Sequence, residues 1–138
     1  MSKLIHEVLT EVNKQKTKKD KIKVLKQNET WGLKDIIRGS MDPTVVWNLP
    51  GGDPPYTACE PQNAPANLQR ENTKFAYLRK GFQGDDLPPY KRESILFGIL
   101  EGVDPGDAAL VVDMINKKTP AGLTKPIVEE AFPGLLKG

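Results

Sequence analysis

The chain has 138 residues, of which 38% are hydrophobic and 28% are charged, and its net charge is +2. This length suits one domain with a modest core, and the composition excludes wholesale disorder. The single cysteine, Cys59, excludes an internal disulfide and favours a reducing compartment, and no run of residues is apolar enough for a membrane span or a signal peptide. We therefore expect one domain, residues 1–138, in a cytoplasmic protein.

The first part of the chain predicts three short helices. Apolar residues recur at helical spacing over residues 4–12, which indicates an amphipathic first helix with Ser2 as its cap. Thr17 begins a pattern that resembles a capping box and starts the second helix. Thr30 can cap a third helix, which is expected to end near Gly39.

The start of the second helix carries the strongest charge feature of the sequence. Residues 1–50 hold 10 Lys and Arg against 6 Asp and Glu, whereas residues 51–138 hold 10 against 12, so the basic excess is local. Such a dense run can neutralise phosphates without regard to sequence. It could equally be a solvated helix face that keeps the protein soluble. The run consists of Lys14, Lys16, Lys18, Lys19, Lys21, Lys23 and Lys26.

Two loops rich in proline and glycine, residues 42–65 and 81–90, interrupt the middle of the chain. Their prolines exclude long regular structure, and a connection as long as the first loop is often functional in a compact domain. Apolar residues at helical spacing predict a fourth helix over about residues 67–80. We find no internal repeat, no heptad register and no alternating strand pattern.

The last third of the chain predicts two amphipathic helices and a short capped one. Apolar stripes recur over residues 95–103 and 108–115, and we expect them to face each other. Gly122 then turns the chain, and Thr124 starts the last helix. Phe132 is expected to anchor that helix on the two stripes. The whole pattern predicts an all-α fold, a compact single domain of about six helices.

The residue types needed for catalysis or metal binding form no convincing constellation. His6 is the one histidine, and no Cys/His cluster has metal spacing. No serine or cysteine has an activating base, and pairs such as Asp85–Asp86 are better explained as solvated carboxylates. The glycine pairs lack the strand–glycine–helix setting of a phosphate loop. We therefore expect no enzyme, with no catalytic residue, cofactor or metal.

A second basic feature lies around the turn before the last helix. Lys117 and Lys118 precede the turn, and Lys125 follows it. The backbone N–H groups of residues 122–125 are expected at a helix start, where free donors and the helix dipole favour a phosphate oxygen. Gly122 would let the backbone come close to such a ligand.

Both ends of the chain resemble a known family. The closing run GLTKPIVEEAFPGL, residues 122–135, is similar to the end of the amino-terminal DNA-binding domain of the ATP-dependent DNA ligases of T-even bacteriophages. The opening is similar as well, because an apolar helix is followed by TKKDK, residues 17–21, which resembles the start of that domain's second helix. Helices follow in the same order between the ends, and the loop of residues 42–65 departs from the ligase pattern. The chain also resembles small uncharacterised proteins of T-even-like phages, including phages of cyanobacteria.

This resemblance implies an all-α domain that contacts the backbone of duplex DNA on its minor-groove side. It nominates six residues for DNA contact, namely Lys16, Lys18, Lys19, Gly122, Thr124 and Lys125. The charge pattern adds Lys21, Lys23, Lys117 and Lys118. The Lys-x-Asp-Gly motif of a ligase is missing from the chain. We therefore expect a non-catalytic, largely sequence-independent duplex DNA-binding module, an accessory in phage DNA replication or repair in the cytoplasm of an infected cell.

Two other functions stay open at this point. The chain could be a phage adaptor that binds a host or phage protein through the loop from Trp47 to Pro65, or it could be a structural component of a virion. Binding to arbitrary DNA that weakens steeply with salt would favour the DNA-binding module. Recovery of a protein partner would favour the adaptor.

Overall fold

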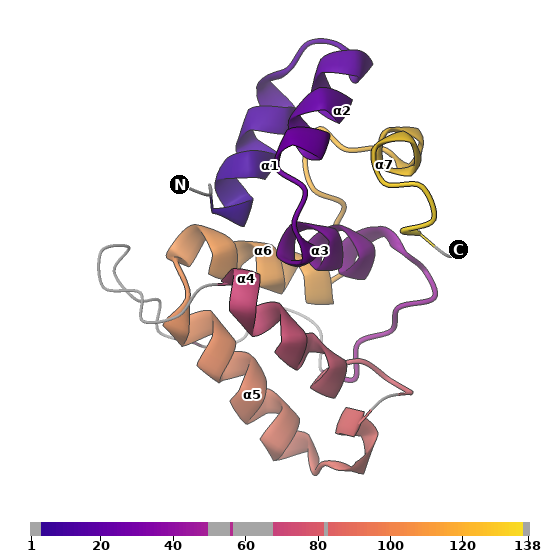
Figure 1. Ribbon diagram of the computed structural model, residues 1–138. Coiled ribbons are helices and arrows are strands. Elements are labelled where there is room, and N and C mark those ends of the chain that lie inside the picture. The colour runs from indigo at the N-terminus through magenta and orange to yellow at the C-terminus, as the bar shows by residue number, and fades with distance from the viewer. Residues whose placement is uncertain (1–3, 50–55, 57–67, 82, 137–138) are drawn as a thin grey trace.

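The computed structural model describes residues 4–49, 56, 68–81 and 83–136, and within these ranges the protein is helical (Figure 1). The described residues contain no strand beyond one isolated antiparallel bridge between Trp47 and Arg79, so the all-α prediction is confirmed. None of their helices is long and apolar enough to cross a membrane. Six helices have seven residues or more: α1 (Ile5–Lys14), α2 (Lys18–Gln27), α3 (Trp31–Met41), α5 (Pro89–Gly102), α6 (Pro105–Ile115) and α7 (Lys125–Ala131).

These helices form three groups along the molecule (Figure 1). Helices α1, α2 and α7 make one end, α3 and α6 cross the middle with the short helix α4 (Leu68–Glu71) packed against α3, and α5 extends to the other end. Helix α2 packs against α1 and α7, while α6 packs against α3, α5 and α1. The predicted contact between the stripes of α5 and α6 is therefore confirmed. One continuous hydrophobic core joins all three groups.

The starts of the first three helices follow from local capping. The hydroxyl oxygens of Thr17 and Thr30 each accept a hydrogen bond of 3.2 Å from the backbone N–H three residues further on, as the sequence predicts. Helix α1 begins differently. Its cap position is Leu4, whose backbone N–H donates to the carboxylate of Glu7 at 2.8 Å, and Ser2 lies outside the described residues.

The prediction of one continuous fourth helix over residues 67–80 is wrong. The single turn of α4 tightens into a 3₁₀ helix, η2 (Asn72–Tyr77). Because a 3₁₀ helix repeats every three residues, Phe75 and Leu78 fall on the same side, and both are buried. The chain then leaves the helix to pair with the segment after α3, where the N–H of Asn48 donates to the carbonyl of Leu78 at 2.7 Å.

Arg92 of α5 binds two connecting segments that come earlier in the chain, one after α3 and one just before α5. Its guanidinium donates to the carbonyls of Gly84 at 2.9 Å and Leu87 at 2.6 Å, and also to the carbonyl of Asn48 at 3.0 Å. The side chain is buried, and the three carbonyl acceptors offset the free-energy cost of removing its charge from water. Part of the predicted second loop is thus ordered by α5, which begins at Pro89, inside that loop.

The last helix docks elsewhere than expected. Helix α7 packs against α2, so the prediction that it docks on the α5–α6 stripes is wrong. Phe132, directly after α7, is buried and has the Nζ of Lys34 in α3 at 5.5 Å from its ring centroid. An amphipathic pattern shows which face a helix buries but leaves its partner open, and α2 has apolar residues to offer, including Ile22 and Val24.

Candidate nucleic-acid interface

Helix α2 sorts its lysines onto separate faces. Lys18 and Lys21 contact the C-terminal part of the chain, at helix α7 and at the turn before it. The Nζ atom of Lys18 is 3.2 Å from Oε2 of Glu130 in α7, and the Nζ of Lys21 donates to the carbonyl of Gly122 at 3.0 Å. These two lysines therefore help to join α2 to the turn and helix that close the fold.

Lys19, Lys23 and Lys26 lie on another face of the same helix. Their spacing of four and then three residues places them in one row along the helix. Together with Asp20 and Ile22 they line a shallow depression of about 650 Å³. All three side chains are exposed, and no ion pair joins them to another described residue. Lys16, just before the helix, is exposed as well. We call these four lysines the α2 lysine face.

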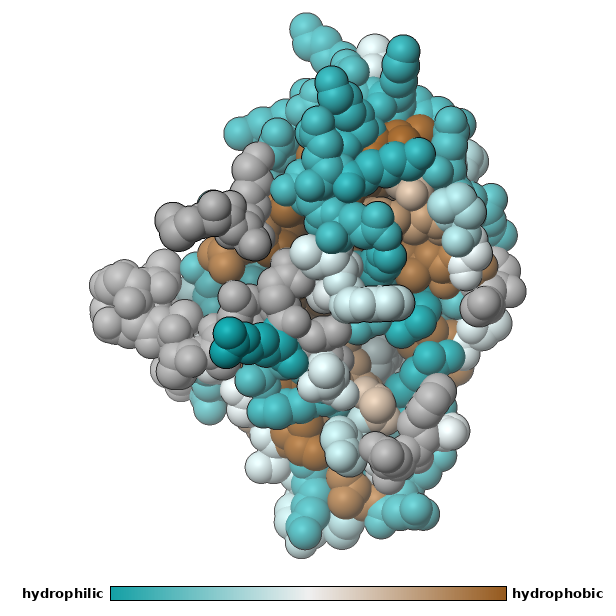
Figure 2. All heavy atoms as spheres, in the orientation of Figure 1, coloured by the Kyte–Doolittle hydropathy of each residue, from teal (hydrophilic) through white to brown (hydrophobic). Residues whose placement is uncertain are grey.

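The α2 lysine face concentrates like charge. Neighbouring lysines at these spacings repel one another, by about 0.2–0.5 kcal/mol per pair on a helix. Asp20 is the one acidic residue that shares their depression. Figure 2 shows hydrophilic side chains gathered over the end of the molecule where α1 and α2 lie in Figure 1. A bound anion would relieve the repulsion, so this face is suited to phosphate groups. Lys26, which belongs to the predicted basic run but was not among the predicted contacts, shares the depression of Lys19 and Lys23.

The ammonium of Lys117 is bound to the end of α3, although the residue as a whole is exposed. Its Nζ donates to the carbonyls of Gly39 at 2.8 Å, Asp42 at 2.7 Å and Val45 at 3.0 Å. The first two are among the carbonyls that the end of α3 leaves without a helical partner. Burial lowers the pKa of the Lys117 ammonium, and the charge of Asp42 opposes that shift. Lys117 was predicted to contact DNA, but its hydrogen bonds give it a structural role.

The backbone at Lys117 explains how its side chain reaches α3. The residue has a φ of 57° and follows the cap of α6. Its N–H donates to the carbonyl of Met114, and the N–H of Lys118 donates to that of Asp113. This pair of bonds is the Schellman motif, in which glycine is the usual residue at the position of Lys117. The chain therefore places a lysine where the backbone favours glycine. Lys118 is exposed as well, and no hydrogen bond from its side chain to another described residue ties it to the fold as Lys117 is tied.

Gly122 is packed against α1. Its φ is +85°, and a Cβ atom at this position would lie 2.8 Å from both Cα and Oδ1 of Asn13. Its carbonyl already accepts the hydrogen bond from Lys21. The predicted glycine turn is therefore present, but it brings the chain onto α1 instead of standing open for a phosphate.

The other two residues predicted at this turn are exposed. Thr124 is the cap residue of α7, yet its side chain makes no capping hydrogen bond. The Nζ of Lys125 lies 4.0 Å from Oε1 of Glu129 on the same helix. Such an exposed pair contributes little to stability, so Lys125 can exchange this partner for another anion.

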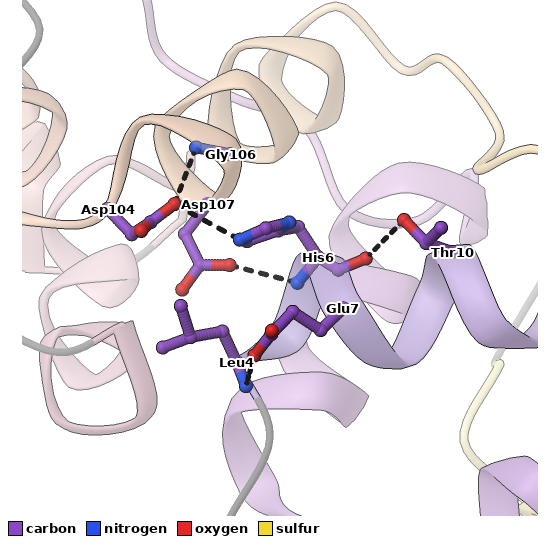
Figure 3. Close-up of polar contacts among 7 residues, drawn as sticks. All are labelled: Leu4, His6, Glu7, Thr10, Asp104, Gly106 and Asp107. Atoms are coloured by element: carbon purple, nitrogen blue, oxygen red, sulfur yellow. Dashed lines mark hydrogen bonds and ion pairs between the residues drawn. The ribbon is translucent and has the colours of Figure 1, made fainter. Parts of the chain in front are cut away.

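His6 belongs to a polar link between α1 and α6 (Figure 3). Its backbone N–H donates to Oδ1 of Asp107 at 2.9 Å, and its Nε2 lies 3.0 Å from Oδ1 of Asp104. The same oxygen of Asp104 caps α6 by accepting the N–H of Gly106 at 2.8 Å. Burial raises the pKa of Asp107, and its hydrogen bond and charge interaction with His6 oppose that shift. Among the described residues no three His, Cys, Asp or Glu side chains form a metal-binding group.

Comparison with known proteins finds a protein family whose matched region includes the α2 lysine face. A protein-family model matches residues 8–120, which include the four lysines of the face, Lys117 and Lys118. A search of the curated proteins finds no match. Because the family match covers far more than half of the 138 residues, this chain belongs to the family of unknown function DUF6433.

Proposed function

We propose that this protein is a non-catalytic module that binds the phosphate backbone of duplex DNA, largely without regard to sequence. The observation that carries the proposal is the row formed by Lys19, Lys23 and Lys26, which are exposed, share one depression and have no ion pair with another described residue. The resemblance of both chain ends to the DNA-binding domain of phage DNA ligases supports a role as an accessory in phage DNA replication or repair.

The chemistry of lysine suits this kind of contact. Its ammonium is a point charge on a flexible stem, so it can follow phosphates without a fixed geometry. Each phosphate that a lysine neutralises releases counterions from the duplex. Lys16 extends the row beyond the start of α2, and Lys18 can join it because its pairing with Glu130 is exposed. Lys117 and Gly122 are left out of the proposed interface because both have structural contacts.

A salt titration of a triple variant tests the proposal. Replacing Lys19, Lys23 and Lys26 with glutamine should weaken binding to every duplex sequence and reduce the slope of log Kd against log salt by about one unit per lost contact. The fold should persist, since the three side chains are exposed. The measurement is the affinity for short duplexes of unrelated sequence at several salt concentrations, with circular dichroism as a check of folding.

A matched control distinguishes binding by the α2 lysine face from binding that depends only on the net charge of the protein. Arg70, Lys80 and Lys91 are also exposed, and replacing all three with glutamine removes the same charge from outside α2. This control should retain most of the salt slope. If both triple variants lose affinity equally, binding depends on overall charge and the proposed interface is wrong. If the α2 variant binds like the parent at low salt, its lysines are only a solvated face, and the adaptor function becomes the better explanation.

A further inference from the structure

Helix α7 places a glutamate against the basic start of α2. Oε2 of Glu130 lies 3.2 Å from the Nζ of Lys18, which is the first residue of α2. Both side chains are more than half exposed, Lys18 at 54% and Glu130 at 60%. Lys19 directly follows Lys18 in the chain, and Lys16 lies two residues before it. A carboxylate therefore stands beside the start of the α2 lysine face.

The fold does not depend on this ion pair to hold α7. The helix buries Ile127, Val128 and Ala131, and Phe132 directly after it is buried as well. Burial of apolar side chains is the dominant favourable contribution to packing, whereas an ion pair in contact with water contributes little. The apolar face of α7 is therefore sufficient to dock it against α2, and the charge of Glu130 is not required for stability.

The ammonium of Lys18 has two competing anionic partners if α2 binds DNA. One is the carboxylate of Glu130, and the other is a phosphate of the duplex. A lysine ammonium is a point charge on a flexible stem, so it can move from one to the other. The phosphate has an advantage, because neutralising it also releases counterions that are condensed on the duplex. DNA can therefore displace Glu130, but it must overcome the attraction within the pair.

Glu130 also opposes DNA by repulsion. Charges in solvent interact over a Debye length of about 8 Å at physiological ionic strength, and a phosphate bound to Lys18 would lie within that distance of the carboxylate. The second ion pair of α7, between Lys125 and Glu129, is longer at 4.0 Å. Its order along the helix, with the lysine before the glutamate, is the less favourable one. Glu130 is therefore the stronger competitor of the two.

We propose that Glu130 is a built-in competitor of the DNA backbone. It holds Lys18 in the unbound protein and releases it to a phosphate in the complex, so that it limits the affinity of the α2 lysine face. This inference rests on the proposed function and adds a means of regulating the same site. Affinity differences between related complexes lie mostly in the dissociation rate, so the competitor makes a sequence-independent contact easier to release.

Glu130→Gln tests the proposal, because it removes the charge and keeps the size and polarity of the side chain. The variant should bind duplex DNA about two- to fivefold more tightly than the parent at low salt, which corresponds to the strength of an exposed ion pair. The gain should shrink as salt screens the pair and the repulsion. Fluorescence anisotropy of a labelled duplex of arbitrary sequence, titrated with the full chain at several salt concentrations, measures it. Thermal melts of parent and variant should coincide.

A matched control and a double variant identify the mechanism. Glu101→Gln removes the same charge from an exposed position on α5 and should give no comparable gain. In a Lys18→Gln background, Glu130→Gln should add little, because the ammonium for which the two anions compete is gone. A gain that persists in full without Lys18 would show that Glu130 merely repels DNA, and the exchange would be wrong.

The remaining outcomes separate this inference from the proposed function. If the glutamine variant of Lys19, Lys23 and Lys26 loses affinity while Glu130→Gln binds like the parent or like Glu101→Gln, the DNA-binding function stands and the competitor alone is overturned. If neither the parent nor any variant binds duplex DNA, both proposals are overturned. A gain confined to Glu130→Gln, and dependent on Lys18, supports both.

Discussion

Lys117 combines a backbone conformation that is costly for a lysine with three hydrogen bonds from its ammonium. A non-glycine residue at positive φ costs about 1–2 kcal/mol, whereas hydrogen bonds of a charged group contribute about 1.5–3 kcal/mol. The hydrogen bonds should therefore stabilise the fold by more than the backbone strain destabilises it. Lys117→Met should therefore lower the free energy of unfolding by about 1–3 kcal/mol, as measured by urea denaturation.

Two companion variants sharpen this prediction. Lys117→Gly removes the same ammonium but relieves the strained backbone, so it should be less destabilising than Lys117→Met by about 1 kcal/mol. Lys118→Met changes an exposed side chain and should stay within about 0.5 kcal/mol of the parent. If Lys117→Gly proves more stable than the parent, the ammonium contributes less than the strain costs, and Lys117 is free to serve elsewhere.

Asp107 should give the stability of the protein a distinct pH dependence. Burial raises its pKa in the folded state above the ordinary 3.8, so the folded protein holds this proton more tightly than the unfolded chain does. The stability that this group contributes is therefore complete below pH 3.8 and is lost as the pH rises through the raised pKa.

Asp107→Asn tests this sign. The amide oxygen of asparagine can still accept the N–H of His6 but has no proton to lose, so the variant should gain stability relative to the parent as the pH rises from 3.8 towards neutrality. Urea unfolding at a series of pH values measures the difference. Asp113→Asn, on the exposed side of α6, is the control. A difference for Asp107→Asn that stays constant with pH would contradict the assignment.

The turn at Gly122 leads into α7 and is packed against α1. Gly122→Ala should destabilise the protein by about 1–3 kcal/mol, because the added Cβ meets Asn13 and the positive φ disfavours any side chain. Gly98→Ala offers the opposite case, since Gly98 lies in α5 with open space around it. That change should stabilise the protein by about 0.5–1 kcal/mol. Thermal melts compare the two, and equal shifts in Tm would show that the turn does not hold α7 in place.

Helix positions and partners were not equally predictable. Thr17 and Thr30 mark helix starts through contacts only three residues away, so the sequence reveals them locally. Lys21 and Lys117 meet carbonyls more than 70 residues away in the chain, and nothing in their sequence surroundings distinguishes them from Lys19 or Lys23. Lys21 and Lys117 therefore contribute to the fold while the other predicted lysines lie on the surface, and only the packing of the helices separates the two sets.

For the molecule as a whole, composition and periodicity predicted an all-α domain because one apolar face per helix is enough to build a core. The exposed tryptophan at the start of α3 was not predicted, because Trp31 looks like any apolar residue at a helix start until its 72% exposure is known. The same limit applies to the docking of α7, since apolar stripes are interchangeable as partners.

The carbonyl of Gly39 accepts hydrogen bonds from both the indole of Trp47 and the ammonium of Lys117. One acceptor at the end of α3 thus joins the indole of Trp47 to the last turn of α6. A change that loosens Trp47 should therefore speed the local opening of α6, which hydrogen exchange at its final amides would register. By the same reasoning, losing the Lys117 ammonium should loosen Trp47, although the two side chains share only this one oxygen.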